Sequence, residues 1–86
     1  GKLHIGENVK EMLESDLKIE HDGRNDYIEA ITYCESVKDY VTRDMLRDLL
    51  ADEEGHIDHI ETELKLIEQV GIQNYLQRQM QMAGEE

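Results

Sequence analysis

The sequence predicts an all-α protein, and three observations lead to this prediction. None of the 86 residues is proline. The helix formers Glu, Leu, Lys, Gln, Arg and Met are abundant, and apolar residues recur at steps of three and four, as one face of a helix requires. The alternation of β-branched and aromatic residues that is typical of strands is hard to find. We therefore expect two long helices, one short helix and no sheet.

The first long helix is expected over about residues 8–37. The opening segment, Gly1–Gly6, has no helical period and is predicted to be a loop, and Asn8 is the candidate N-cap. Gly23 interrupts the helix propensity but does not end the helix. The apolar stripe of this helix runs through Val9, Leu13, Leu17, Tyr27, Ile31 and Cys34.

The second long helix is expected over about residues 39–70, with Asp39 as its N-cap. Gly71 is a suitable C-terminal stop, because glycine commonly follows the last helical residue. A short third helix is expected over about residues 73–80, and residues 83–86 are expected to fray. The stripe of the second helix runs through Val41, Met45, Leu49, Ile60, Leu64 and Ile67.

These elements predict an antiparallel helical hairpin followed by a short C-terminal helix. Each long helix has about 30 residues, or roughly 45 Å at 1.5 Å per residue. Two helices shield only part of each other's apolar surface, and Phe, Trp and any second cysteine beside Cys34 are absent. We therefore expect a partner chain to supply further helices and complete a four-helix bundle.

The formal net charge of −12 restricts the class of partner. It disfavours binding to nucleic acids and to anionic membranes, and it favours attraction of cations. No apolar run approaches the roughly 20 residues of a membrane span, and the lack of a disulfide framework favours the cytoplasm. The chain starts at Gly1 rather than Met, which predicts a processed product or a piece of a longer chain.

Both stripes have a gap that is filled by potential metal ligands. Glu20 follows Leu17 in the first stripe, and Glu53 and His56 lie between Leu49 and Ile60 in the second. An isolated carboxylate in a core costs several kcal/mol, so buried charges are paired or coordinate metals. A divalent cation would satisfy all three groups at once.

The three residues are also predicted to lie level with one another. Glu20 is 18 residues before Lys38 in the expected turn, and Glu53 and His56 are 15 and 18 residues after it. Residues three apart share a helix face, so Glu53 and His56 can reach one metal centre. A carboxylate-rich set with one imidazole suits iron or manganese before zinc.

The alternative is an acidic helical interaction subunit that completes a bundle without any metal. In that case a buried Glu–His pair, or a salt bridge between Arg24 and Glu20, would occupy the same positions. His59, three residues after His56, is either an accessory ligand or a packed residue at the boundary of the core.

The sequence resembles the bacterioferritins, members of the ferritin-like family, over essentially its whole length. The combination of Asp52–Asp58 (DEEGHID) with Gly71–Leu76 (GIQNYL) carries the resemblance most specifically. The segments Gly1–Glu7, Ser36–Val41 and Glu61–Leu64 add to it. The resemblance is to the second half of a bacterioferritin subunit, which implies a ferritin-like bundle completed by a chain that carries the N-terminal half.

The resemblance also implies a function for the candidate ligands. Glu20 would be a terminal ligand to one iron, Glu53 would bridge two irons, and His56 would bind one of them. Together they would form half of a di-iron ferroxidase centre that oxidises Fe(II) in a hollow, multi-subunit iron-storage cage. Haem b would lie between paired subunits, with its ligand outside this chain. Many members carry tryptophan at the position of His59.

Overall fold

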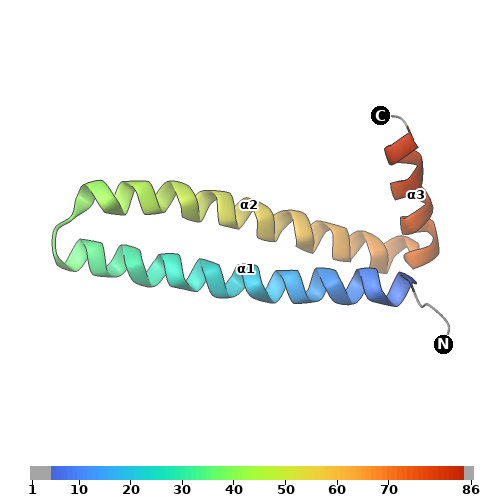
Figure 1. Ribbon diagram of the computed structural model, residues 1–86, viewed down its shortest axis with the longest axis horizontal. Coiled ribbons are helices and arrows are strands. Elements are labelled where there is room, and N and C mark those ends of the chain that lie inside the picture. The colour runs from blue at the N-terminus through green and yellow to red at the C-terminus, as the bar shows by residue number, and fades with distance from the viewer. Residues whose placement is uncertain (1–4, 85–86) are drawn as a thin grey trace.

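The computed structural model describes the backbone of residues 5–84 and the side chains of residues 8–84. The chain forms three helices, α1 (Ile5–Ser36), α2 (Tyr40–Val70) and α3 (Ile72–Gly84). Helices α1 and α2 run antiparallel, and α3 stands across the end at which α1 begins (Figure 1). No strand occurs within residues 5–84, so the predicted all-α hairpin with a C-terminal helix is confirmed.

Two helix boundaries differ from the prediction by more than one residue. Helix α1 begins at Ile5, three residues before the expected start, so the predicted loop is wrong at Ile5 and Gly6, and its first four residues lie outside the described range. Helix α3 continues to Gly84 rather than stopping near residue 80, because no stop signal interrupts its run of helix formers.

The turn between α1 and α2 occupies Val37–Asp39 and follows the predicted capping chemistry. Lys38 adopts φ 62°, a left-handed conformation that reverses the chain direction in few residues. The Asp39 carboxylate accepts hydrogen bonds from the Thr42 backbone N–H at 3.1 Å and from the Thr42 hydroxyl at 2.6 Å. Asp39 is therefore the N-cap of α2, and the helix proper begins one residue later, at Tyr40.

Helix α2 ends as the sequence predicts, at Gly71. This residue has φ 82°, which favours glycine, and its N–H donates a hydrogen bond to the Ile67 carbonyl at 2.8 Å. After the turn, the ring of Tyr75 on α3 is 6% exposed, and its hydroxyl donates to the Glu63 carboxylate on α2 at 2.6 Å. This buried ring and its hydrogen bond hold α3 against α2.

The core of the hairpin confirms one predicted stripe and corrects the other. The α1 stripe faces α2, from half-buried Leu13 and Leu17 to buried Cys34. On α2, however, Val41, Met45 and Leu49 are 84%, 58% and 40% exposed. Helix α2 has two apolar rows, and the sequence alone does not say which row faces α1. The inward row consists of Leu46, Leu50, Glu53, Ile57, Ile60, Leu64 and Ile67.

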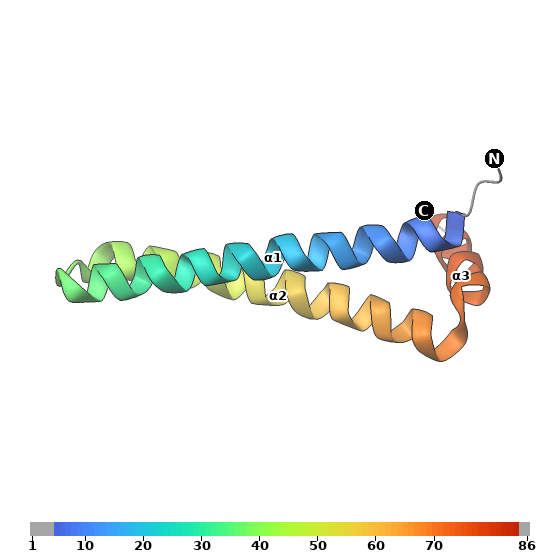
Figure 2. The same ribbon diagram turned by 90° about the horizontal axis from the view of Figure 1, so that it is seen from below.

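Much apolar surface of the hairpin is open. The chain exposes 6809 Å², whereas a compact monomer of 10.0 kDa is expected to expose about 5,200 Å². Figure 2 shows why: two helices lie in one layer and diverge toward the end that carries α3. In residues 5–84, no helix is both long enough and apolar enough to span a bilayer.

Candidate metal centre

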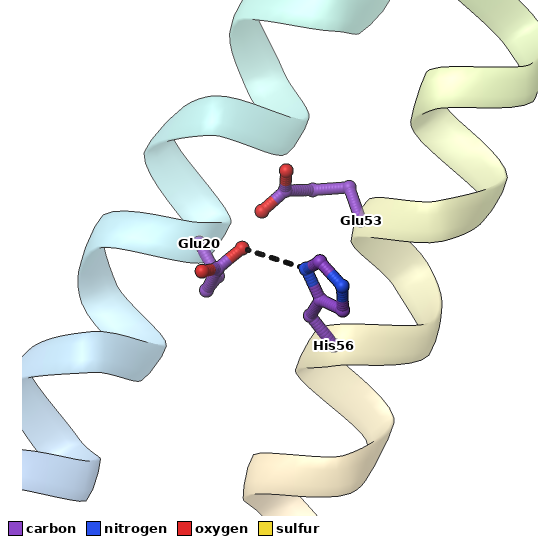
Figure 3. Close-up of side chains that lie close together, drawn as sticks. All are labelled: Glu20, Glu53 and His56. Carbon is purple, nitrogen blue, oxygen red and sulfur yellow. Dashed lines mark ion pairs between the residues drawn. The ribbon is translucent and has the colours of Figure 1, made fainter.

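The three predicted ligands meet between the two long helices. Glu20 projects from α1, and Glu53 and His56 project toward it from α2, as Figure 3 shows. Glu53 and His56 share a face because they are three residues apart on the same helix. One ligand atom from each side chain lies within 4.8 Å of the other two. The structure thus brings together all three residues, and metal binding by them stays a prediction.

The carboxylates and the imidazole differ in exposure. The side chain of Glu20 is 28% exposed, Glu53 is half-buried, and the side chain of His56 is 65% exposed. The sequence placed His56 in the core, and for the hairpin this is wrong. Ile57, the next residue, occupies the inward row instead. His56 therefore lies at the margin of the α1–α2 interface, where it can complete a site with groups from outside the hairpin.

Charge is only partly balanced among the three groups. His56 Nδ1 lies 3.7 Å from Glu20 Oε2, an ion pair when the imidazole is protonated (Figure 3). This contact is the Glu–His pair of the metal-free alternative, although it is not buried. No ion pair among the side chains of residues 8–84 involves Glu53. A cation placed between the two carboxylates would balance both at once.

The donor set fits a divalent first-row metal. Such ions bind carboxylate oxygen and imidazole nitrogen at about 2.0–2.2 Å, so ligands of one ion lie within about 4.4 Å of one another. The 4.8 Å spread of Glu20, Glu53 and His56 needs shifts of only a few tenths of an ångström. Three ligands leave coordination positions open, so the site of the hairpin is incomplete.

Two neighbours of the site were not predicted. The Arg24 guanidinium pairs with Glu54 across the helices, and not with Glu20 as one form of the metal-free alternative would have it. The long side chain of Arg24, at the edge of the α1–α2 interface, can reach a carboxylate on the facing helix as easily as one on its own helix. Next to it, Gly23 lies against Glu53: a Cβ at residue 23 would sit 3.6–3.7 Å from the end of that side chain. The sequence showed Gly23 only as a weak point in the helix.

Other sequence candidates lie outside the cluster. Cys34 is buried near the turn, in agreement with a role as a small core residue. Within residues 8–84 the group of potential ligands contains Glu20, Glu53 and His56 but not His59. His59 is exposed on α2, and an accessory role for it stays untested.

Comparison with known proteins identifies the family. The model of the ferritin family, described as a ferritin-like domain, matches residues 1–70. The chain belongs to the ferritin family. Among its relatives is a bacterioferritin of Brucella melitensis, 51% identical over 73 residues, which are 85% of this chain and 45% of the relative. A bacterial ferritin of Pseudomonas aeruginosa is 47% identical over 79 residues, 91% of this chain and 51% of the relative.

The resemblance to bacterioferritins is therefore confirmed over most of the chain. A bacterial ferritin of a Synechocystis species is 46% identical over 79 residues, which are 91% of this chain and 51% of the relative. This ferritin-family chain spans about half the length of the relatives that it matches. A hairpin of two long helices is half of a four-helix bundle, which agrees with this share of the length.

Proposed function

We propose that this chain is the C-terminal half of a bacterioferritin subunit and contributes half of a di-iron ferroxidase centre. The observation that carries the proposal is the convergence of Glu20, Glu53 and His56 within 4.8 Å. A ferritin-like di-iron bundle uses one Glu from each of two helices and one Glu-x-x-His from each of the other two. This hairpin supplies one of each. Further helices would supply the other set and enclose the site.

The roles of the three side chains follow from their places. Glu20 lies on α1 and would hold one iron from that side. Glu53 belongs to the inward row of α2, close to Glu20 and Gly23 on α1, and would bridge two irons. The imidazole of His56 would hold one of them. Carboxylates are hard oxygen donors and stabilise Fe(III) more than Fe(II). When bound, an iron pair supplies two adjacent one-electron donors for an oxidant such as dioxygen or peroxide.

The acidic surface supports supply of the substrate, Fe(II). The chain carries 21 acidic and 9 basic residues, and a field of one sign raises the local concentration of ions of the other sign. In this proposal the completed bundle belongs to a cytoplasmic, multi-subunit cage that stores iron. Haem b between paired subunits is part of the same proposal, and no residue of this chain is assigned as its ligand.

The open apolar rows support completion by other helices. Val41, Met45 and Leu49 on α2, and Met12 and Ile19 on α1, are between 40% and 84% exposed. Contiguous exposed apolar surface of this kind marks an interaction site. The hairpin alone should therefore aggregate or fold poorly. A cooperative thermal transition in the isolated monomer would contradict this expectation.

The central test is the initial rate of Fe(II) oxidation by protein assembled with the complementary helices. We expect Glu53→Ala and His56→Ala to abolish rapid oxidation while the assembly keeps its size. Glu61→Ala is the matched control, because Glu61 is an exposed acid on the same helix and its loss changes the charge equally. Unchanged rates in both ligand variants would overturn the proposal.

The alternative function is an acidic interaction subunit without metal, which the contact between Glu20 and His56 favours. Metal analysis of the assembled protein separates the two functions. About two metal ions per completed bundle support the di-iron centre. Metal-free protein with intact assembly supports the interaction subunit.

A further inference from the structure

Gly23 stands out among the glycines of the long helices because of what it faces. Glycine is among the least favourable residues in a helix interior. A Cβ added at Gly23 would lie 3.6 Å from Cδ, 3.6 Å from Oε1 and 3.7 Å from Oε2 of Glu53. A Cβ added at Gly55, in the middle of α2, would meet nothing within 4 Å. Both glycines are unfavourable for the helix, but only at Gly23 would an added Cβ contact a candidate ligand on the facing helix.

The near-equal distances define what a side chain at residue 23 would do. Since a Cβ would be almost equally far from Cδ and both oxygens of Glu53, it would lie over the face of the carboxylate. All three distances are ordinary contacts, so the present orientation tolerates the methyl group. Each carboxylate oxygen, however, lies about 1 Å off the Cγ–Cδ axis. A quarter turn about that axis would bring one oxygen closer than 3.0 Å, a separation that real Cβ atoms essentially never show.

We propose that Gly23 is a positioning residue that leaves the Glu53 carboxylate free to rotate over α1. This inference rests on the proposed function, in which Glu53 bridges two metal ions. In that role one oxygen of Glu53 would face each metal ion, so the carboxylate would have to be free to turn about its Cγ–Cδ bond. A glycine at residue 23 permits that turn with Glu53 in place, whereas a Cβ at residue 23 would force the end of the Glu53 side chain away from α1 as its carboxylate turned.

The test compares Gly23→Ala with the matched control Gly55→Ala in the assembled protein. Both variants remove a helical glycine, so both should raise the thermal midpoint of the metal-free protein. Only Gly23→Ala should change the visible absorption of the Co(II)-loaded protein and lower the initial rate of Fe(II) oxidation, by at least about fivefold. The number of Co(II) ions bound should stay the same, because no ligand is removed.

The outcomes distinguish the proposed di-metal centre from the proposed role of Gly23. If the unmodified protein binds no Co(II), the di-metal centre is wrong, and the role of Gly23 falls with it. If it binds Co(II) but Gly23→Ala matches Gly55→Ala in spectrum and rate, only the role of Gly23 is overturned. A Gly23→Ala variant that fails to assemble would contradict the ordinary contact distances on which the inference depends, and would overturn it as well.

Discussion

Replacing Tyr75 with Phe should weaken the attachment of α3 to α2 and leave the packing of α1 against α2 unchanged. Tyr75 is one of only four buried apolar residues among the described side chains, and it lies on α3. Phe keeps the ring in place and removes only the hydroxyl that donates to Glu63 at 2.6 Å. A hydrogen bond to a charged group contributes about 1.5–3 kcal/mol. Because Glu63 is half-buried and regains some water, we expect a loss of about 1–2 kcal/mol.

Limited proteolysis measures this loss, because Arg78 lies on α3 and trypsin cleaves there only when the helix opens. A loss of 1–2 kcal/mol corresponds to about 5–30-fold faster cleavage after Arg78. Cleavage after Arg47, within α2, should not change. Tyr33→Phe is the control variant, because Tyr33 is 67% exposed. An unchanged rate at Arg78 in Tyr75→Phe would refute the reasoning.

The same hydrogen bond sets a pH dependence. Burial of the ring, followed by the hydrogen bond to Glu63 and the charge of Glu63, raises the pKa of Tyr75 from 10.0 to about 12. The raised pKa means that the folded protein favours the neutral phenol over the phenolate. The pKa is raised on folding, so this stabilisation is complete below pH 10 and is lost as the pH rises toward 12. The phenolate absorbance should show a step near pH 12 that Tyr75→Phe removes; a step that persists would assign it to another tyrosine.

Two further predictions concern the turn between α1 and α2. Lys38→Gly should stabilise the assembled protein by about 1 kcal/mol, because a left-handed residue with a Cβ is strained; a lower midpoint in denaturant would contradict this. Asp39→Ala should lower the thermal midpoint at pH 7 by removing both hydrogen bonds from Thr42. These hydrogen bonds lower the pKa of Asp39 below 3.8, so the difference should be present above pH 3.8 and disappear as the pH falls through the lowered pKa. A difference that persists in stronger acid would exclude the carboxylate as its source.

The predictable part of the fold rests on local chemistry. Asp39 and Gly71 are short-range signals whose hydrogen bonds and backbone angles need only a few neighbours, and both act as the sequence predicts. The meeting of Glu20 with Glu53 and His56 follows from counting residues to a turn, because helices rise by a constant length per residue. Local signals of this kind place the ligands at one level without knowledge of the packing.

The errors arise where packing decides. Helix α2 carries two apolar rows, and the choice between Met45 and Leu46 as the inward residue depends on how α1 approaches. Because the row that contains Leu46 faces α1, His56 lies at the margin of the α1–α2 interface and not in its core. The closeness of Gly23 to Glu53 could not be predicted for a related reason: it depends on where the end of a side chain from another helix lies. Spacing within one helix contains no information on such contacts across helices.

The attachment of α3 separates two properties of the protein. Helix α3 joins the hairpin through Gly71, through the buried Tyr75 with its hydrogen bond to Glu63, and through a hydrogen bond that the Asn74 amide donates to the Val70 carbonyl at 2.8 Å. This junction lies at the end of α2 remote from the turn. The candidate ligands lie in the middle of the hairpin and share no residue with this junction. Substitutions in α3 should therefore change this end of the hairpin without moving Glu20, Glu53 or His56. The orientation of α3 and the geometry of the candidate metal centre can therefore vary as independent traits in protein engineering.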